Sequence, residues 1–146
     1  MNKADMLYRR AIEIATQAHI GQVDKGGNPY IDHPLAVAED VEDITLKIVA
    51  ILHDVLEDSD MTAGDLLTEG FSREIVDAVC VLSHDKSDSI SYEDYICHVK
   101  ENPIARAVKI SDINHNLDLS RIPNPTAHDY ARCEKYRKAL AYLLQE

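Results

Sequence analysis

The amino-acid sequence predicts an all-α fold, and three observations support this prediction. Apolar residues recur at spacings of three and four along most of the 146 residues. Gly and Pro number only 5 each, so few positions interrupt these segments. No stretch alternates apolar and polar residues with the period of two that a half-buried strand requires. We therefore expect one domain over residues 1–146, a helical bundle of about seven to eight helices.

The first two helices are predicted on either side of a glycine-rich loop. Residues 3–20 carry apolar side chains at helical spacing, and Gly21 ends this segment. The sequence Asp-Lys-Gly-Gly-Asn-Pro over residues 24–29 is typical of a loop. Pro34 suits the first turn of a second helix that runs to about residue 41. His33 would then lie at the entry of that helix.

Six further helices follow from apolar periodicity and from capping residues. One begins near residues 43–45 and continues through residue 58, and a short one over 63–69 is capped by Thr62. The next is capped by Ser72 and runs to residue 82, before a polar loop at 84–89. Ser91 begins a helix to residue 100, Pro103 opens one that ends near residue 119, and the last spans about 127–144.

Composition excludes several classes of function. Fifteen Lys and Arg against 26 Asp and Glu give a formal net charge of −11, which leaves no electrostatic surface for duplex nucleic acid. No apolar run is long enough to span a membrane, and the polar N-terminus does not resemble a signal peptide. The three cysteines are scattered and form no Cys-x-x-Cys pair. We expect a cytoplasmic protein with reduced thiols.

Polar residues interrupt an apolar segment at positions 50–58, whose sequence is Ala-Ile-Leu-His-Asp-Val-Leu-Glu-Asp. In a continuous helix His53 would stack with Glu57, and Asp54 with Asp58, because residues four apart share a side. Three carboxylates and an imidazole beside a buried helix face are costly to desolvate unless a cation compensates them. The segment therefore indicates a metal site.

Asp112 interrupts a second apolar segment, and Asn116 lies one helical turn after it. A lone Asp in a helix is more often capped or salt-bridged than a metal ligand. Taken together with His33, His53 and Asp54, however, Asp112 completes a set of nitrogen and oxygen donors. Such a set suits Mn²⁺, Fe²⁺, Zn²⁺ or Mg²⁺ with positions left open for water. A metal of this kind makes a nucleophile from bound water at neutral pH.

Four ordered motifs resemble the hydrolase domain of the RelA/SpoT homologue family, a group of HD-domain phosphohydrolases. They are Pro-Tyr-Ile-Asp-His-Pro-Leu-Ala-Val-Ala at 29–38, Leu-His-Asp-Val-Leu-Glu-Asp at 52–58, Ser-Tyr-Glu-Asp-Tyr at 91–95 and Val-Lys-Ile-Ser-Asp-Ile-Asn-His-Asn-Leu at 108–117. The match extends from His19 to the last helix and leaves no room here for a synthetase domain. The chain thus looks like the stand-alone small alarmone hydrolase type.

This resemblance implies a role for each matching residue. One divalent metal, typically Mn²⁺ in this family, would be held by four ligands: His33, His53, Asp54 and Asp112. Glu57 and Asp58 would orient and deprotonate the attacking water. The family reaction removes the 3′-pyrophosphate of guanosine tetra- or pentaphosphate. Residues implied near this small nucleotide substrate are Lys25, Asn116, Arg132 and Tyr136.

Two positions depart from the family pattern. Asp24 stands where the family loop usually carries an Arg that holds the nucleotide, and Ile113 stands where a basic residue is common. An Asp cannot stack on a base as a guanidinium does, although it can accept hydrogen bonds from an amino group or from ribose hydroxyls. On this reasoning Asp24→Arg should raise activity on guanosine alarmones.

Three readings of function follow. The first is a metal-dependent phosphohydrolase acting on a nucleotide with a 3′-pyrophosphate. The second is an HD phosphohydrolase acting on another small nucleotide or phosphate ester. The third is a nucleotide-sensing module that binds without turnover. The presence of every expected metal ligand and of both acidic residues favours an enzyme.

Overall fold

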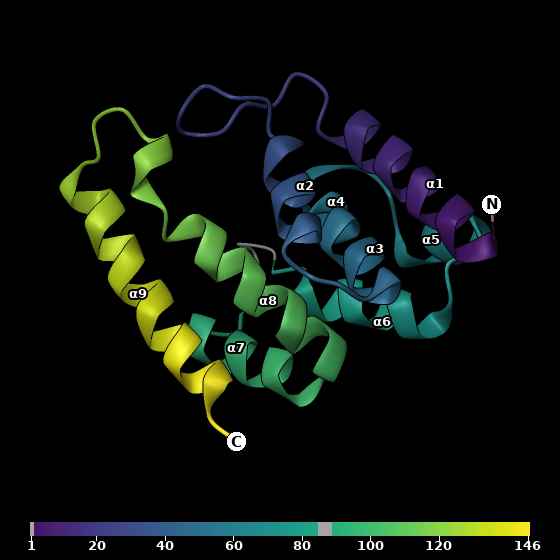
Figure 1. Cartoon of the computed structure of the whole chain (residues 1–146). Coiled ribbons are helices and arrows are strands. Elements are labelled where there is room, and N and C mark those ends of the chain that lie inside the picture. The colour runs from purple at the N-terminus through teal and green to yellow at the C-terminus, as the bar shows by residue number, and fades with distance from the viewer. Residues whose placement is uncertain (1, 85–88) are drawn as a thin grey trace.

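The computed structural model describes residues 2–84 and 89–146, and these residues form an all-α fold, as predicted (Figure 1). The only extended pairing in the described residues is an isolated antiparallel bridge between Val23 and Pro29. The elements are α1 (Lys3–Ala18), α2 (Asp32–Glu39), α3 (Ile44–Leu52), α4 (Val55–Asp58), α5 (Ala63–Thr68), α6 (Arg73–Leu82), α7 (Tyr92–Glu101), α8 (Pro103–Asn116), a 3₁₀ turn η1 (Leu119–Arg121) and α9 (Ala127–Leu144).

Helices α3 and α8 lie at the centre of the bundle. α3 packs against α1, α2, α6 and α8, and α8 packs against α2, α3, α6, α7 and α9. Five consecutive residues at the end of α3, Ile48 to Leu52, are at most 2% exposed, so this helix is enclosed by its neighbours. Figure 1 shows α9 running alongside α8 on the outside of the bundle. Side chains at the ends of α3 and α8 therefore point into the interior.

The helix expected to run through residue 58 is interrupted at His53 and Asp54, where the chain makes a turn between α3 and α4. The ring Nδ1 of His53 lies 2.5 Å from the carbonyl oxygen of Ala50. That oxygen is the acceptor that the backbone N–H of Asp54 would use if the helix continued. Asp54 adopts φ −103° and ψ 0°, outside the ordinary helical values. Because of this division, the described residues form nine α-helices where the sequence predicted eight helical segments.

The capping residues account for most helix starts. The side chains of Ser72 and Ser91 accept hydrogen bonds from backbone N–H groups in the first turns of α6 and α7, and Thr62 forms a capping box with Asp65. The caps of α8 and α9 are among those not predicted from the sequence. Asn102 caps α8 directly before Pro103, and Thr126 forms a second capping box at the start of α9. These caps hold α8 and α9 in the register that the site requires.

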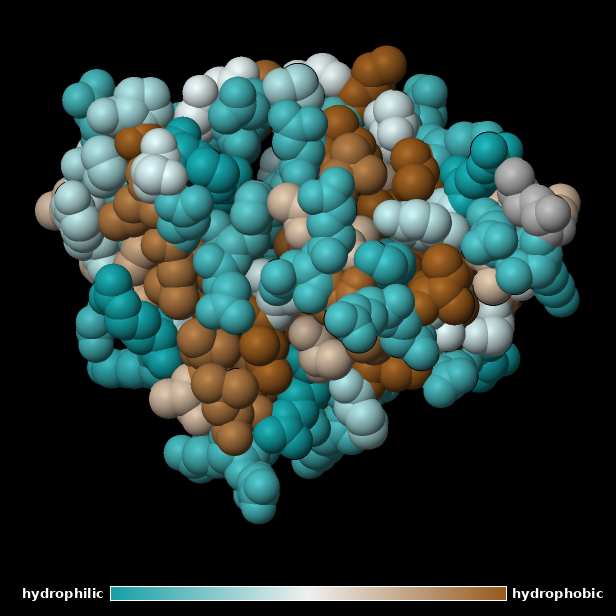
Figure 2. Space-filling view, viewed as in Figure 1, coloured by the Kyte–Doolittle hydropathy of each residue, from teal (hydrophilic) through white to brown (hydrophobic). Residues whose placement is uncertain are grey.

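The face shown in Figure 2 is mainly hydrophilic and carries separate hydrophobic patches. No helix in the described ranges is long and apolar enough to cross a membrane. Cys80, Cys97 and Cys133 are free, in agreement with the expected reduced thiols. The polar loop expected at 84–89 falls mostly on residues 85–88, which lie outside the described part of the chain.

Candidate metal centre

Three buried side chains from different segments converge at the centre of the bundle. His33 comes from the first turn of α2, His53 from the turn after α3, and Asp112 from α8. One ligand atom from each lies within 4.8 Å of the other two. Asp54 is close beside them, with its Oδ2 atom 3.1 Å from the Nε2 atom of His53. The structure thus brings together all four residues that the sequence indicated as metal ligands.

The Nε2 atom of His53 shows that this cluster fits a cation. It is buried and has no hydrogen-bond partner among the described residues. Because Nδ1 donates to the carbonyl of Ala50, Nε2 is the ring atom that offers a lone pair to a metal when the imidazole is neutral. That lone pair faces the Oδ2 atom of Asp54 at 3.1 Å and the Oδ1 atom of Asp112 at 3.3 Å. Three electron-rich atoms at this separation are the donor set of a divalent metal.

His115 orients the second imidazole. Its Nδ1 atom lies 2.6 Å from the Nδ1 atom of His33, and the two rings stack with centroids 4.8 Å apart. When Nδ1 of His33 donates to His115, the Nε2 atom of His33 is left to bind a metal beside Asp112, whose Oδ1 atom is 2.7 Å away. His115 belongs to the motif at residues 108–117, but no role had been predicted for it.

Lys109 is the cation that permits burial of Asp112. Its Nζ atom donates to the Oδ2 atom of Asp112 at 2.9 Å. Burial alone would raise the pKa of Asp112, but the attraction of Lys109, together with the contacts to His33 and His53, outweighs burial and holds that pKa well below its ordinary value. With Asp54 and Asp112 ionised and Lys109 protonated, these three side chains together carry one negative charge. Lys109 was missed from the sequence, although its spacing of three from Asp112 was a usable signal.

Tyr30 fixes the position of Asp54. Its hydroxyl donates to the Oδ2 atom of Asp54 at 2.5 Å. Desolvation, followed by the nearby charge of Asp54, raises the pKa of the Tyr30 hydroxyl, which therefore stays protonated and remains a donor. Tyr30 belongs to the motif at residues 29–38, but no role had been assigned to it.

Glu57 and Asp58 lie on different sides of this centre. Glu57 borders a cavity of about 240 Å³ whose walls also include His33, Asp54 and Asp112. Its Oε1 atom accepts a hydrogen bond from the backbone N–H of His84. Desolvation raises the pKa of Glu57 to about 7. This carboxylate can therefore take up a proton near neutral pH.

Asp58 instead faces α1 and the loop that follows it. Its Oδ2 atom accepts a hydrogen bond from the side chain of Gln22 at 3.4 Å and lies 3.6 Å from Nδ1 of His19. The cavity it borders is a different one. Desolvation and the charge of Asp54 raise its pKa. In a continuous helix Glu57 would stack on His53 and Asp58 on Asp54. Because the helix is interrupted after Leu52, this stacking does not continue from α3 into α4.

A second cavity, of about 340 Å³, adjoins the metal centre. All five residues predicted to contact substrate line it: Asp24, Lys25, Asn116, Arg132 and Tyr136. Three residues, Tyr30, Asn116 and Tyr136, belong to the walls of both cavities. Asn116 also donates to the Oδ1 atom of Asp112 at 3.3 Å. The two cavities therefore lie side by side and share part of their walls, and we call them together the cleft.

Ile113, the second departure from the family pattern, does not face this cleft. Its side chain is completely buried in the hydrophobic core. The position therefore cannot contribute a substrate contact here.

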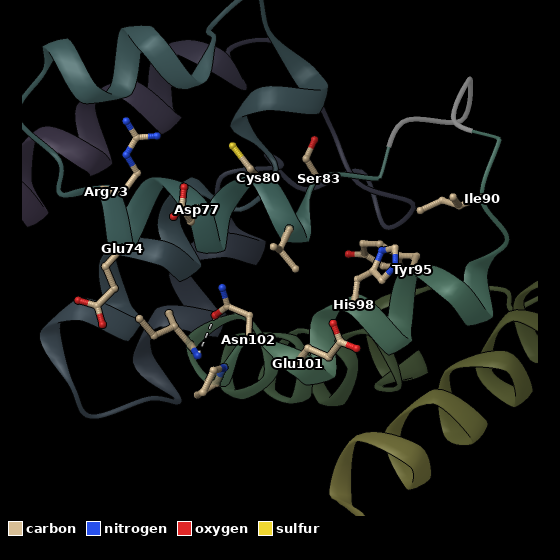
Figure 3. A pocket seen from close by; sticks show the side chains of 13 residues that line it. Arg73, Glu74, Asp77, Cys80, Ser83, Ile90, Tyr95, His98, Glu101 and Asn102 are labelled. Carbon is tan, nitrogen blue, oxygen red and sulfur yellow. Dashed lines mark hydrogen bonds between the residues drawn. The ribbon is translucent and has the colours of Figure 1, made fainter.

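A larger cavity, of about 900 Å³, lies elsewhere, between α6, α7 and the start of α8. Figure 3 shows Arg73 and Asp77 from α6 and His98 and Glu101 from α7 around it. None of the residues predicted for the site lines this cavity.

Comparisons with known proteins agree with this arrangement. The chain is 33% identical over 130 residues to a probable GTP pyrophosphokinase of Mycobacterium leprae, covering 82% of this chain and 16% of that protein. It is 34% identical over 128 residues to a guanosine-3′,5′-bis(diphosphate) 3′-pyrophosphohydrolase of Borreliella burgdorferi, covering 78% of this chain and 19% of that protein. The chain thus spans less than a fifth of the length of either relative. No family model matches.

A solved structure has the same fold. It is described as a metazoan orthologue of SpoT that hydrolyses ppGpp, and it superimposes with a TM-score of 0.74 at 22% identity. The superposition covers 95% of this chain and 85% of that one. Three findings lead to one assignment. The sequence similarity to these relatives extends over most of the chain, the helical fold is shared, and residues from the motifs converge on one buried cluster. The chain belongs to the RelA/SpoT family, in the part of it that carries the hydrolase fold.

Proposed function

We propose that this chain is a metal-dependent phosphohydrolase that removes the 3′-pyrophosphate of guanosine tetra- or pentaphosphate. The observation that carries the proposal is that the cavity at the buried cluster and the second cavity are neighbours that share three wall residues. If the 3′-pyrophosphate of a nucleotide lies at the cluster, its base, ribose and 5′-phosphates can lie in the second cavity. The names of the curated relatives, which include 3′-pyrophosphohydrolases, support the same reaction. We further propose that the whole chain acts as one HD-type domain in the cytoplasm.

The proposed metal ligands are His33, His53, Asp54 and Asp112, and the proposed metal is Mn²⁺. A mixed set of two imidazoles and two carboxylates, with positions left for water, suits this ion. When bound, the metal would acidify water and offset phosphate charge. Tyr30 and His115 hold two of these ligands in place through the short contacts described above.

Glu57 is the proposed general base. The reaction breaks the bond between the 3′-oxygen of the ribose and the adjacent phosphorus. Water supplies the new P–O bond, pyrophosphate leaves, and the 3′-oxygen ends as a hydroxyl. Glu57 borders the cavity in which this water must lie, and its pKa of about 7 suits a proton acceptor at neutral pH. Asp58 remains a proposed second catalytic residue, and Gln22 holds it in position.

Lys25 and Arg132 are the proposed phosphate-binding cations of the second cavity. Both donate to the same oxygen of the buried Asp129, at 3.1 Å and 2.6 Å. Two cations on one carboxylate leave a net positive charge, which suits the 5′-phosphates of the substrate. Asp129 thus orders these two side chains before any nucleotide binds.

One assay tests this function. Metal-stripped protein reloaded with Mn²⁺ is offered guanosine and adenosine 3′-pyrophosphates and simple monophosphates. We expect pyrophosphate to be released from the guanosine substrate. Phosphate release from monophosphates alone would support the second reading, and binding of metal and nucleotide without any product would support the non-catalytic module. Asp58→Asn should bind metal as the wild type does but turn over more slowly, and a wild-type rate would remove Asp58 from the catalytic set.

A further inference from the structure

Arg121 occupies the wall of the second cavity at which the sequence had indicated a missing arginine. It ends the 3₁₀ turn between α8 and α9, and it lines the cavity together with Asp24. Its Nη1 atom lies 3.4 Å from the Oδ2 atom of Asp24, a residue 97 positions earlier in the chain. In Figure 1 the loop after α1 and the turn after α8 lie together, at the end of the molecule away from the C-terminus. A guanidinium is therefore present in this wall although residue 24 is an Asp.

Both carboxylate oxygens of Asp24 make contacts within this wall. Its Oδ1 atom accepts hydrogen bonds from the backbone N–H groups of Gly26 and Asn28, at 2.8 Å and 3.0 Å. Its Oδ2 atom faces Arg121. Both oxygens are thus engaged within the protein, so Asp24 is poorly placed to accept hydrogen bonds from a ligand. The direct contact expected from the sequence is replaced by a carboxylate that positions an arginine.

The loop and the turn also fit closely through their backbones. A Cβ atom at Gly26 would lie 2.2 Å from the carbonyl oxygen of Arg121. This distance is too short for any residue with a side chain to fit here without moving the backbone. Only glycine therefore allows the loop to approach the turn this closely. This contact places the guanidinium of Arg121 against the loop.

The guanidinium of Arg121 retains unused donors. Its two hydrogen bonds, to Asp24 and to the carbonyl oxygen of His115, are both long at 3.4 Å. Its Nε atom has no partner among the residues that the structure describes. A guanidinium carries five N–H donors in a planar fork, so this side chain can still bind a ligand that offers acceptors.

Charge decides which part of a nucleotide this arginine suits. Lys25 and Arg132 share one carboxylate and leave a positive charge, whereas Arg121 is paired one-to-one with Asp24. A neutral pair attracts phosphate weakly but still presents hydrogen-bond donors. The edge of guanine with its O6 and N7 atoms offers two acceptors to such a fork, whereas adenine presents an amino donor at the same edge.

We propose that Arg121, positioned by Asp24, binds the nucleobase and selects guanine over adenine. This inference rests on the proposed function, because it assumes that a nucleotide lies in the cleft with its 3′-pyrophosphate at the metal centre. It makes Arg121 a specificity-determining residue that replaces the arginine missing from the loop. It also reverses one expectation. Asp24→Arg should lower activity, because it removes the acceptor for two backbone N–H groups and places two guanidinium groups together.

The test compares wild type, Arg121→Ala, Arg121→Lys and the matched control Arg137→Ala on guanosine and adenosine 3′,5′-bis(diphosphate) with Mn²⁺. Arg137 is exposed on α9 and pairs only with the exposed Glu134 among the described residues. We expect wild type and Arg137→Ala to favour the guanosine substrate in kcat/KM by about 5- to 150-fold, the discrimination that one bidentate arginine–guanine pair provides. In Arg121→Ala the ratio of kcat/KM for the guanosine substrate to that for the adenosine substrate should fall towards one. The change should come from a higher KM for the guanosine substrate, with kcat little changed.

Arg121→Lys keeps the charge and the contact with Asp24 but lacks the fork, so it should lose most of the preference while remaining folded. Binding of GDP and ADP to metal-free protein, measured by calorimetry, should show the same loss without catalysis. An unchanged guanine preference in both variants would overturn the proposal. An equal loss for the two bases would also overturn it, because it would assign Arg121 to the phosphates or the ribose. Wild-type protein that releases no pyrophosphate from either substrate, yet binds GDP more tightly than ADP through Arg121, would refute the proposed function alone.

Discussion

Metal binding should raise the thermal stability of this protein, because the metal centre is electrostatically incomplete without a cation. The lone pair on Nε2 of His53 faces two carboxylate oxygens at 3.1 Å and 3.3 Å. Lys109 offsets the charge of Asp112, but Asp54 has only the hydroxyl of Tyr30 as a donor among the described residues. A divalent cation would be bound by these donor atoms in the folded state. The unfolded chain has no preformed site, so the binding energy adds to folding stability.

The magnitude follows from linkage. Free metal at 100 times its dissociation constant stabilises the folded state by about 2.7 kcal/mol. For a protein of this size, each kcal/mol raises the Tm by roughly 2–4 °C. Metal-stripped protein should therefore gain roughly 5–11 °C when Mn²⁺ is added, as measured by calorimetry or circular dichroism at a fixed protein concentration.

Two variants and a control separate this site from nonspecific binding to an acidic protein. His53→Gln removes one ligand and should lose most of the shift. Asp112→Asn should also lose it, starting from a lower Tm, because Lys109 then has no charged partner. His98→Gln is the control, because His98 is exposed on α7 and does not line the cavity at the metal centre. An equal shift in all four proteins, or none with any divalent metal, would refute the assignment.

Three further predictions concern the surroundings of the centre. Glu57, with its pKa raised to about 7, must be deprotonated to act as a base, so kcat should fall as the pH drops below about 7. Glu57→Gln should lower kcat by about 10²–10⁴-fold and abolish this acidic limb in steady-state assays. Lys109→Met should destabilise the protein by roughly 3–5 kcal/mol in urea unfolding, because it leaves Asp112 buried without its cation. Gly26→Ala should lower kcat/KM by on the order of 10- to 100-fold while leaving metal affinity unchanged, because it separates the loop from Arg121. Wild-type values in the corresponding assay would contradict each one.

Local patterns in the sequence predicted most of the fold. Helix α9 begins and ends where periodicity placed it, at residues 127 and 144, and Thr62 and Ser72 cap the helices they were expected to cap. These features depend on residues within one or two turns of each other, so a single segment contains the necessary information. The four expected metal ligands also come together, because each belongs to a motif whose neighbours are buried.

Features that depend on distant contacts could not be predicted in the same way. The interruption after α3 depends on the ring of His53 taking the carbonyl of Ala50, and helical spacing alone gives no sign of it. It places Asp58 towards Gln22 rather than in the cavity of Glu57. The loss of an arginine at residue 24 was visible in the sequence, but its replacement lies 97 residues away. Only the packing of the loop against the turn reveals it.

The acidic character of the whole chain does not describe the cleft. Five cations line its two cavities: Lys25, Lys109, Arg121, Arg132 and Lys135. Five carboxylates line them as well: Asp24, Asp54, Glu57, Asp112 and Asp118. The lining is thus formally neutral in a protein with a net charge of −11, and it holds a third of the chain's 15 basic residues. A divalent metal would make the cleft net positive, while the remaining surface stays acidic. An anionic nucleotide is then attracted to the cleft alone, and bound metal and bound phosphate each strengthen the binding of the other.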